Sequence, residues 1–350
     1  LGIGLRSEMN ILIAGGAGFI GSAFARLVAR ERPDWTLVVF DKLTYAGNLN
    51  NLQEIDGRYT FNRGDIADRA AVQAALSQHA IDSVVNFAAE SHVDRSIISV
   101  LEFVVTDVIG TYILLSEARR AGGVQRFVQV STDEVYGSIG QGAWTEESPL
   151  QPNSPYSASK AGGDLQVRAA HRTYGFPGIV TRGSNTYGPY HYPEKLIPLC
   201  ITNLLEGKKI PLYGDGTNRR DWLHVDDHAR GVLAVLESGQ PGEVYNLGSD
   251  EEYENRALVQ LILRELGLGP EWITYVPDRP GHDQRYALDS SKARALGWSP
   301  AVELPVGLRL TVQWYKDHSD WWKPLKNGAY EEFYRTQYAS LGGLAASGVS

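Results

Sequence analysis

Two residues four positions apart, Tyr156 and Lys160, could together take a proton from a hydroxyl group. On a helix this spacing places both side chains on one face. A free tyrosine has a pKa of about 10, which is too high for an efficient base at neutral pH. A nearby ammonium group favours the phenolate, so the pattern predicts a general base and a residue that tunes it. A surface tyrosine beside a solvated lysine would give the same spacing.

Two adjacent acids, Asp133 and Glu134, follow Thr132 at the end of an apolar run. In an irregular segment consecutive side chains point in different directions, so two carboxyls could address neighbouring carbon atoms. Two close carboxyls also push each other's pKa values apart, which gives one acid and one base. Such a pair suits the loss of water beside a ketone. The alternative is a pair of solvated acids in a loop.

A glycine-rich segment follows the first apolar run, with Gly15, Gly18 and Gly21 spaced Gly-x-x-Gly-x-x-Gly. Glycines let the backbone turn tightly against a pyrophosphate, and the next helix points its N-terminal N–H groups at the negative charge. A predicted strand at Asn10–Ala14 and a predicted helix at 21–30 supply the context that this motif needs. The segment predicts a dinucleotide site, and glycines used only for close packing are the alternative.

Asp41 follows a second predicted strand at 36–40, about twenty residues after Gly21. A carboxylate there accepts hydrogen bonds from the adenosine ribose and repels a 2′-phosphate, which favours NAD over NADP. The positive charge of Lys42, beside Asp41, weakens this preference for NAD. Asp65 and Ile66 follow a possible third strand and could contact the adenine.

Strands and helices alternate through the first half of the chain. The predicted strands are Asn10–Ala14, 36–40, 83–87, 126–131 and 178–182, and the predicted helices are 21–30, 100–121 and one that starts near Tyr156. Ser154 can cap this last helix, and Pro155 suits its first position. The alternation predicts an α/β fold with a Rossmann-type doubly wound parallel sheet.

Glycine, proline, tyrosine and charged residues intermingle after about Thr186, as they do in binding loops. We expect an NAD-binding Rossmann domain over residues 9–186, with segments near 225–248 returning to it. A smaller, discontinuous C-terminal domain over 187–330 would bind the substrate. Residues 1–8 and 342–350 are expected to be flexible.

The composition excludes several classes of protein. The 350 residues carry a net charge of −8, which argues against general nucleic-acid binding. Cys200 is the only cysteine, so it forms no intrachain disulfide, and no Cys/His cluster suggests a metal site. No apolar run reaches the length of a membrane span. We expect a cytoplasmic protein that binds neither nucleic acid nor membrane.

Together these motifs resemble the extended short-chain dehydrogenase/reductase family over nearly all of Asn10 to about Trp322. Within it, the run from Ser131 to Gly137 is similar to that of the 4,6-dehydratases that act on dTDP-glucose. Other matching segments are 88–96, 184–190, 193–198, 213–216, 220–222 and 278–282. The resemblance implies an NAD-dependent lyase that converts dTDP-glucose to dTDP-4-keto-6-deoxyglucose.

Two alternatives remain. Related 4-epimerases and decarboxylases resemble this chain in the first domain but usually lack the paired acids after threonine. A non-catalytic NAD-binding regulator belongs to a different class, and the intact set of Tyr156, Lys160, Asp133 and Glu134 argues against it. Uracil and thymine differ by one methyl group, so the sequence leaves the nucleotide base open.

The resemblance implies a role for each matched residue. Tyr156 would take the C4 hydroxyl proton while hydride passes to NAD, and Thr132 would bond the C4 oxygen. Glu134 would remove the C5 proton and Asp133 would protonate the departing C6 hydroxyl. The implied cofactor-binding residues are Gly15, Gly18, Phe19, Ile20, Gly21, Asp41, Lys42, Thr44, Asp65, Ile66, Ala88, Ala89, Ser91, Thr106, Tyr156, Lys160 and Thr186. The implied substrate-binding residues are Ser91, Thr132, Asn185, Lys195, Leu196, Pro211, Tyr213, Arg220, Asn255, Arg279 and His282, with the two arginines on the diphosphate.

The chain departs from the family at two positions. Gly183 stands where cysteine is common, and Thr186 stands where an asparagine helps to place the nicotinamide. Threonine can still donate a hydrogen bond but is shorter, so we expect a shifted cofactor contact and retained function. The resemblance also implies a homodimer through residues 100–121 and 156–174.

Overall fold

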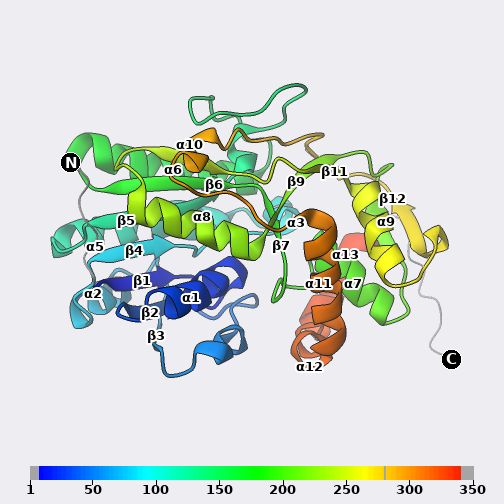
Figure 1. Ribbon diagram of the computed structural model, residues 1–350, viewed down its shortest axis with the longest axis horizontal. Helices are drawn as coiled ribbons and strands as arrows, with labels where there is room; N and C mark the ends of the chain where they lie inside the picture. Colours follow the sequence, from blue (N-terminus) through cyan, green and yellow to red (C-terminus); the bar gives the residue numbers. More distant parts are fainter. Residues whose placement is uncertain (1–7, 280, 340–350) are drawn as a thin grey trace.

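The computed structural model describes residues 8–279 and 281–339. The expectation of flexible ends concerns residues 1–7 and 342–350, which lie outside this described part, and Glu8, which is exposed. Figure 1 shows a layered α/β unit on the left and a smaller group of helices and short strands on the right.

A seven-stranded sheet forms the centre of the larger unit, in the order β10-β6-β5-β4-β1-β2-β3. Its strands are β1 (Asn10–Ala14), β2 (Thr36–Asp41), β3 (Tyr59–Arg63), β4 (Ser83–Asn86), β5 (Arg126–Thr132), β6 (Gly178–Gly183) and β10 (Val244–Leu247). Every neighbouring pair is parallel, which confirms the predicted Rossmann-type sheet. The strand order reverses between β1 and β4, and ligands bind at such a point in open parallel sheets.

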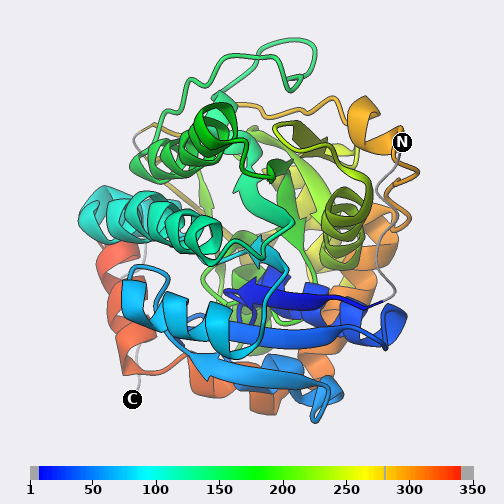
Figure 2. The same cartoon turned by 90° about the vertical axis from the view of Figure 1, so that its left-hand side faces the viewer.

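Helices cover both faces of this sheet because its strands are apolar on both sides. On one face α1 (Phe19–Glu31) packs beside α8 (Val225–Ser238), over a core that includes Phe24 and Val28. On the other face lie α2 (Arg69–Gln78), α5 (Thr111–Ala121) and α6 (Pro155–Tyr174), over a second core. Figure 2 shows α5 and α6 side by side at the surface.

The predicted helix over 100–121 is only partly regular. It consists of α4 (Leu101–Phe103), a π-helical segment η2 (Val104–Gly110) and α5. A π-segment widens a helix by one residue per turn and is frequent at functional sites. The predicted start of α6 is confirmed, because the hydroxyl of Ser154 accepts from the N–H of Ser157 and Pro155 takes the first position.

The smaller unit has its own core, in which Tyr187, Trp222 and Trp322 are buried. It contains a three-stranded sheet, β11-β9-β7, and a two-stranded sheet, β12-β8. These strands are β7 (Asn185–Tyr187), β8 (Ile210–Tyr213), β9 (Arg219–His224), β11 (Glu252–Glu254) and β12 (Ile273–Val276). The helices beside them are α7 (Leu196–Leu205), α9 (Asn255–Glu265), α11 (Leu304–Asp317), α12 (Ser319–Trp322) and α13 (Gly328–Ala339).

Short helical turns complete the described part of the chain. They are η1 (Leu49–Ile55), α3 (Val93–Ile98), η3 (Asp133–Tyr136), η4 (Pro270–Trp272), α10 (Ser291–Arg294) and η5 (Lys323–Leu325). None of the helices in the described ranges is both long enough and apolar enough to cross a membrane.

Candidate active site

The glycine loop joins β1 to α1 at the carboxyl edge of the sheet. Gly15 has φ +72°, and a Cβ there would lie 2.5 Å from the backbone nitrogen of Ala88. A Cβ at Gly21 would collide with the carbonyl oxygen of Gly15. Glycine is therefore required at both positions, by left-handed backbone or by close approach. No side chain caps the start of α1, so its first N–H groups are left for a ligand in the adjoining cavity.

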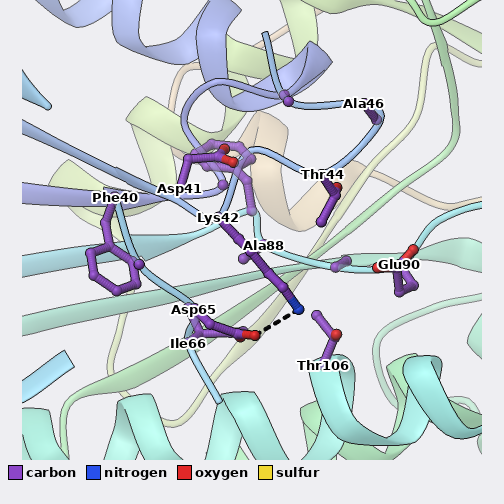
Figure 3. Close-up of a pocket in the computed structure, with 16 residues that line it drawn as sticks. Phe40, Asp41, Lys42, Thr44, Ala46, Asp65, Ile66, Ala88, Glu90 and Thr106 are labelled. Atoms are coloured by element: carbon purple, nitrogen blue, oxygen red, sulfur yellow. Dashed lines mark ion pairs between the residues drawn. The ribbon is translucent and has the colours of Figure 1, made fainter. Parts of the chain in front are cut away.

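A cavity opens at the ends of β2, β3 and β4, and Figure 3 shows the residues that line it. Asp41 accepts hydrogen bonds from the N–H groups of Ala17 (3.0 Å) and Leu43 (2.8 Å). Burial raises the pKa of its carboxyl group, and the two N–H groups oppose that rise. Lys42 Nζ lies 2.7 Å from Asp65 Oδ2, so the charge of Lys42 is balanced inside the cavity.

A second cavity continues from the first, since both are lined by Gly15, Gly18, Ala46, Phe87 and Ala89. All the residues expected to bind the cofactor line one cavity or the other. The second cavity also contains the five residues expected to act in catalysis: Thr132, Asp133, Glu134, Tyr156 and Lys160. A long cleft therefore runs from the end of β3 to the start of α6.

Tyr156 and Lys160 lie one turn apart on α6 and are both buried. Lys160 Nζ donates to the carbonyl oxygen of Val130 at 2.8 Å, which fixes the ammonium group beneath the cleft. Burial raises the pKa of Tyr156 well above its usual value, and the charges of Glu134 and Asp107 raise it further. A hydrogen bond with Thr132 acts in the opposite direction. These effects favour the protonated phenol, and a positive charge near it would favour the phenolate.

The two acids lie on η3, a single 3₁₀ turn where the sequence suggested an irregular segment. Thr132 caps this turn, since its Oγ1 accepts from the N–H of Glu134 at 3.2 Å and donates to Asp133 Oδ1 at 3.1 Å. Burial raises the pKa of Asp133 well above its usual value, and Glu134 and Asp221 add to this. Burial also raises the pKa of Glu134, but cationic side chains oppose it. Asp133 is thus the better proton donor and Glu134 the better base.

The cationic side chains that oppose the rise at Glu134 are Arg279, Arg220 and Lys195. Arg279 Nη1 lies 2.7 Å from Asp94 Oδ1, and Arg220 Nη2 donates to the carbonyl oxygen of Asp283 at 2.8 Å. The structure therefore places both predicted diphosphate ligands on the Glu134 side of the cleft. Each is held by protein groups and can turn its remaining N–H groups to an anion.

The other predicted substrate residues divide into two groups. Ser91, Asn185 and Lys195 line the second cavity, and the buried Oδ1 of Asn185 has no protein partner among the described residues. The remainder lie beyond these two cavities, on or beside β8, α7 and α9: Leu196, Pro211, Tyr213, Asn255 and His282. Tyr213 still reaches toward the site, because its hydroxyl donates to Asp94 at 3.1 Å.

Several residues of the cleft were not among the predicted site residues. They include Glu90, Asp107, His191, Glu194 and His228. His191 stacks on Phe19, with ring centroids 4.1 Å apart, beside the glycine loop. The run Pro193-Glu194-Lys195 matched the resembled family and could have marked Glu194. The two histidines stand in loops or helices whose contacts come from distant parts of the chain.

The two departures from the family meet at His228. Its Nδ1 lies 2.8 Å from Thr186 Oγ1, which also donates to the carbonyl oxygen of Ser184 at 3.1 Å. A Cβ at Gly183 would collide with the same imidazole ring. Within residues 8–279 and 281–339, no group of three or more His, Cys, Asp or Glu side chains could hold a metal ion.

Comparisons with known proteins find relatives along nearly the whole chain. Residues 12–311 match the family model described as GDP-mannose 4,6 dehydratase. The chain is 52% identical over 326 residues to the dTDP-glucose 4,6-dehydratase of Streptomyces niveus, covering 91% of this chain and 96% of that protein. It is 51% identical over 346 residues to the enzyme of the same name from Neisseria meningitidis serogroup B, covering 92% and 97%.

Solved structures are also similar to the chain. DesIV, a dTDP-glucose 4,6-dehydratase from Streptomyces venezuelae with NAD and TYD bound, superposes with a TM-score of 0.88 at 53% identity, covering 91% of this chain and 100% of that one. A UDP-glucose 4-epimerase from Thermotoga maritima with UDP-glucose reaches a TM-score of 0.82 at 30% identity, covering 88% and 99%.

Proposed function

This chain belongs to the 4,6-dehydratase family of sugar-nucleotide enzymes, and from that premise we propose that it converts dTDP-glucose into dTDP-4-keto-6-deoxyglucose. It is an NAD-dependent lyase. The observation that carries this conclusion is the presence of Asp133 and Glu134 in the same cavity as Tyr156 and Lys160. An enzyme that only oxidised and reduced C4 would have no use for the two acids.

The residues of the first cavity and the glycine loop suit NAD. The tight loop and the uncapped start of α1 would hold the pyrophosphate, and Asp41 would hold the adenosine ribose. Bound there, NAD would supply the redox chemistry of the reaction, oxidation at C4 of the hexose and reduction at C6. The Lys42–Asp65 ion pair favours NAD over NADP, because it withholds Lys42 from a 2′-phosphate.

The first step proposed for the chain's own residues is removal of the C4 hydroxyl proton by Tyr156. Thr132, which already hydrogen-bonds the phenol, would hold the C4 oxygen beside it. Lys160 would stabilise the phenolate from the same face of α6 and bind the nicotinamide ribose. A C4 ketone makes the neighbouring C5 hydrogen acidic, which prepares the next step.

Elimination would then use the two acids together. Glu134 removes the C5 proton, the electron pair of that bond forms the C5–C6 double bond, and the C6–oxygen bond breaks. Asp133 gives its proton to the departing hydroxyl, which leaves as water. The retained proton on Asp133 and the cation-supported charge on Glu134 fit these two tasks.

We assign the substrate to the Glu134 side of the cleft. Ser91, Asn185 and Lys195 would contact the hexose, while Arg220 and Arg279 would bind the diphosphate. Leu196, Pro211, Tyr213, Asn255 and His282 would surround the nucleoside beyond the two cavities. The NAD-binding domain would comprise residues 9–186 with the segments near 225–248, and 187–330 would form the sugar-nucleotide domain.

A substrate panel tests this function. We expect the purified protein to convert dTDP-glucose into a product whose ketone absorbs in base, with lower rates for UDP-, GDP- and CDP-glucose. A 4-epimerase would instead convert UDP-glucose without forming that product. A silent NAD-binding regulator would bind NAD, turn over none of the four and be insensitive to Tyr156→Phe. Either of these last two results would overturn the proposal.

We also propose that the protein is a cytoplasmic homodimer. Large apolar side chains are exposed along α3, α4, η2 and α5, and others along α6: Ile97, Ile98, Val100, Leu101, Val104, Ile109, Tyr112, Leu165 and Tyr174. Monomers rarely expose so many neighbouring apolar groups, so a second copy packed on α5 and α6 would cover them. These two helices lie together at the surface in Figure 2.

A further inference from the structure

One buried side chain, Arg182 on β6, joins the two elements that carry the catalytic residues. Its Nε donates to Asp164 Oδ2 at 3.0 Å, and Asp164 lies on α6, two turns after Tyr156. Its Nη1 donates to the hydroxyl of Tyr136 at 2.8 Å, and Tyr136 lies on η3, two residues after Glu134. The guanidinium also lies 4.7 Å from the centre of the Tyr136 ring.

Tyr136 is held from its other side as well. Its hydroxyl donates to Asn246 Oδ1 at 2.8 Å, and Asn246 Nδ2 donates to the carbonyl oxygens of Trp144 and Asp289. The indole of Trp144 stacks on the Tyr136 ring, and its Nε1 donates to the carbonyl oxygen of Gly137 at 3.0 Å. Burial raises the pKa of Tyr136 to about 12, so the hydroxyl remains a donor. The 3₁₀ turn is therefore clamped on two faces.

This network is a costly way to obtain stability alone. Arg182, Asp164 and Tyr136 are all almost fully buried, and apolar side chains of similar volume would fill the space without removing charges from water. What the planar guanidinium adds is geometry, because its fork fixes two partners at a set distance and angle. Here the two partners belong to the helix of the phenol and to the turn of the two acids.

We propose that Arg182 and Tyr136 are positioning residues, which set the placement of Asp133 and Glu134 relative to Tyr156. The inference rests on the proposed function. Proton removal from the C4 hydroxyl depends on Tyr156 and α6, whereas elimination at C5 and C6 depends on η3. Loosening η3 while α6 stays in place therefore slows elimination more than oxidation, since small misplacements of reacting groups are costly.

Tyr136→Phe is the sharpest test, because it keeps the stacked ring and removes only the hydroxyl. We expect kcat with dTDP-glucose to fall about tenfold and KM to change less than about twofold. Reduced nicotinamide should accumulate during turnover, seen by its near-ultraviolet absorbance. Arg182→Lys keeps a charge opposite Asp164 but loses the fork, and should show the same accumulation. If Arg182→Lys turned over dTDP-glucose without accumulating reduced nicotinamide, the geometric role of Arg182 would be refuted.

Tyr245→Phe is a matched control, since Tyr245 is a buried tyrosine of the neighbouring strand β10 whose hydroxyl accepts from the N–H of Gln240 at 2.9 Å. It should lower the melting temperature comparably without accumulation of reduced nicotinamide. The proposal is wrong if Tyr136→Phe turns over normally, or if oxidation and elimination slow equally. A wild-type protein that forms no ketone product would instead refute the proposed function, so the two failures are distinguishable.

Discussion

Asp133 and Glu134 are neighbours in the chain but differ in the charges around them. The carboxyl group of Asp133 is buried and lies near the negative charges of Glu134 and Asp221. Burial and both charges favour its protonated form. Glu134 is also buried, yet Arg279, Arg220 and Lys195 support its ionised form. The proposed division of labour between acid and base therefore depends on residues distant in sequence.

Glu134→Gln tests that division. The amide cannot take a proton from C5, but Tyr156 and its partners are unchanged, so C4 oxidation should proceed. We expect ketone product to fall at least about a hundredfold, while reduced nicotinamide forms on mixing with dTDP-glucose. Stopped-flow absorbance and product assay in base measure the two steps. Normal water loss in this variant would contradict the assignment of Glu134 as the base.

Single residues were predictable where a motif constrained them locally. Tyr156, Lys160, Asp133 and Glu134 were found from spacing, and the structure places all four in one cavity. Their assignment to catalysis remains a proposal. Arg182 and His228 carried no signal, because their hydrogen-bond partners lie 18 or more residues away in the sequence.

At the scale of elements, the π-helical segment η2 carries a buried acid into the site. Asp107 accepts from the N–H of Glu90 at 3.1 Å and from the hydroxyl of Ser159 at 2.6 Å. Burial raises the pKa of Asp107 to about 6, against the charge of Lys160 and the two hydrogen bonds. Burial of the ionised Asp107 in this segment therefore lowers the free energy of unfolding at neutral pH.

The sign of this effect can be measured. Because the folded pKa of Asp107 lies above the ordinary value of 3.8, its contribution favours folding at low pH and is lost as the pH rises to about 6. The size is roughly 3 kcal/mol of unfolding free energy. Asp107→Asn, which carries no titratable group, should flatten the pH dependence of urea midpoints across that window. An unchanged slope, as expected for the exposed control Asp34→Asn, would contradict it.

Strands and helix starts were more predictable than irregularities within helices. The strand Asn10–Ala14 can be predicted from its own apolar residues. The start of α6 can be predicted from the hydroxyl of Ser154. The π-segment was not, since β-branched residues and a glycine over 104–110 weaken a helix without distinguishing a π-turn from an α-turn. Its extra residue is stabilised by contacts with α6, where Gly162 and Gly163 leave room for Val108 and Asp107.

At the scale of the whole molecule, the exposed apolar face along α4, η2 and α6 predicts an assembly. Leu101 is 69% exposed on this face, and Leu310 is 56% exposed on α11, away from it. Leu101→Glu should convert a dimer to monomer in analytical ultracentrifugation, because a charge would be buried against the partner copy. Leu310→Glu should leave the assembly unchanged. A protein that sediments as a monomer before mutation would contradict the proposed interface.

The two units of the chain close the cleft between them. Arg279, in the loop after β12, pairs with Asp94 of α3, and this contact spans the units. Arg279→Met should raise the Kd for dTDP at least about tenfold in calorimetry and leave NAD affinity unchanged, since one charged hydrogen-bond donor is lost. Arg285→Met is the control, because Arg285 is similarly exposed but pairs with Glu252. Equal losses in both variants would contradict the role of Arg279.

The parallel sheet could be predicted from alternation, but the arrangement of the smaller unit could not. β9 pairs with β7 and with β11, but α7 and β8 separate it from β7 in the chain, and α8 and β10 separate it from β11. Short strands of three to six residues carry too little periodicity to be distinguished from loops. Their pairing is decided by the buried core around Trp222, which only the folded chain assembles.

The last strand of the large sheet, β10, comes from residues 244–247 and pairs with β6. When only residues up to 186 have left the ribosome, the edge of β6 that pairs with β10 is therefore open. All six residues of β6 are buried in the finished protein. Such an open edge invites pairing with other chains. Nascent chains must wait for roughly sixty more residues before this edge is sealed, and truncations in that interval should be found in inclusion bodies.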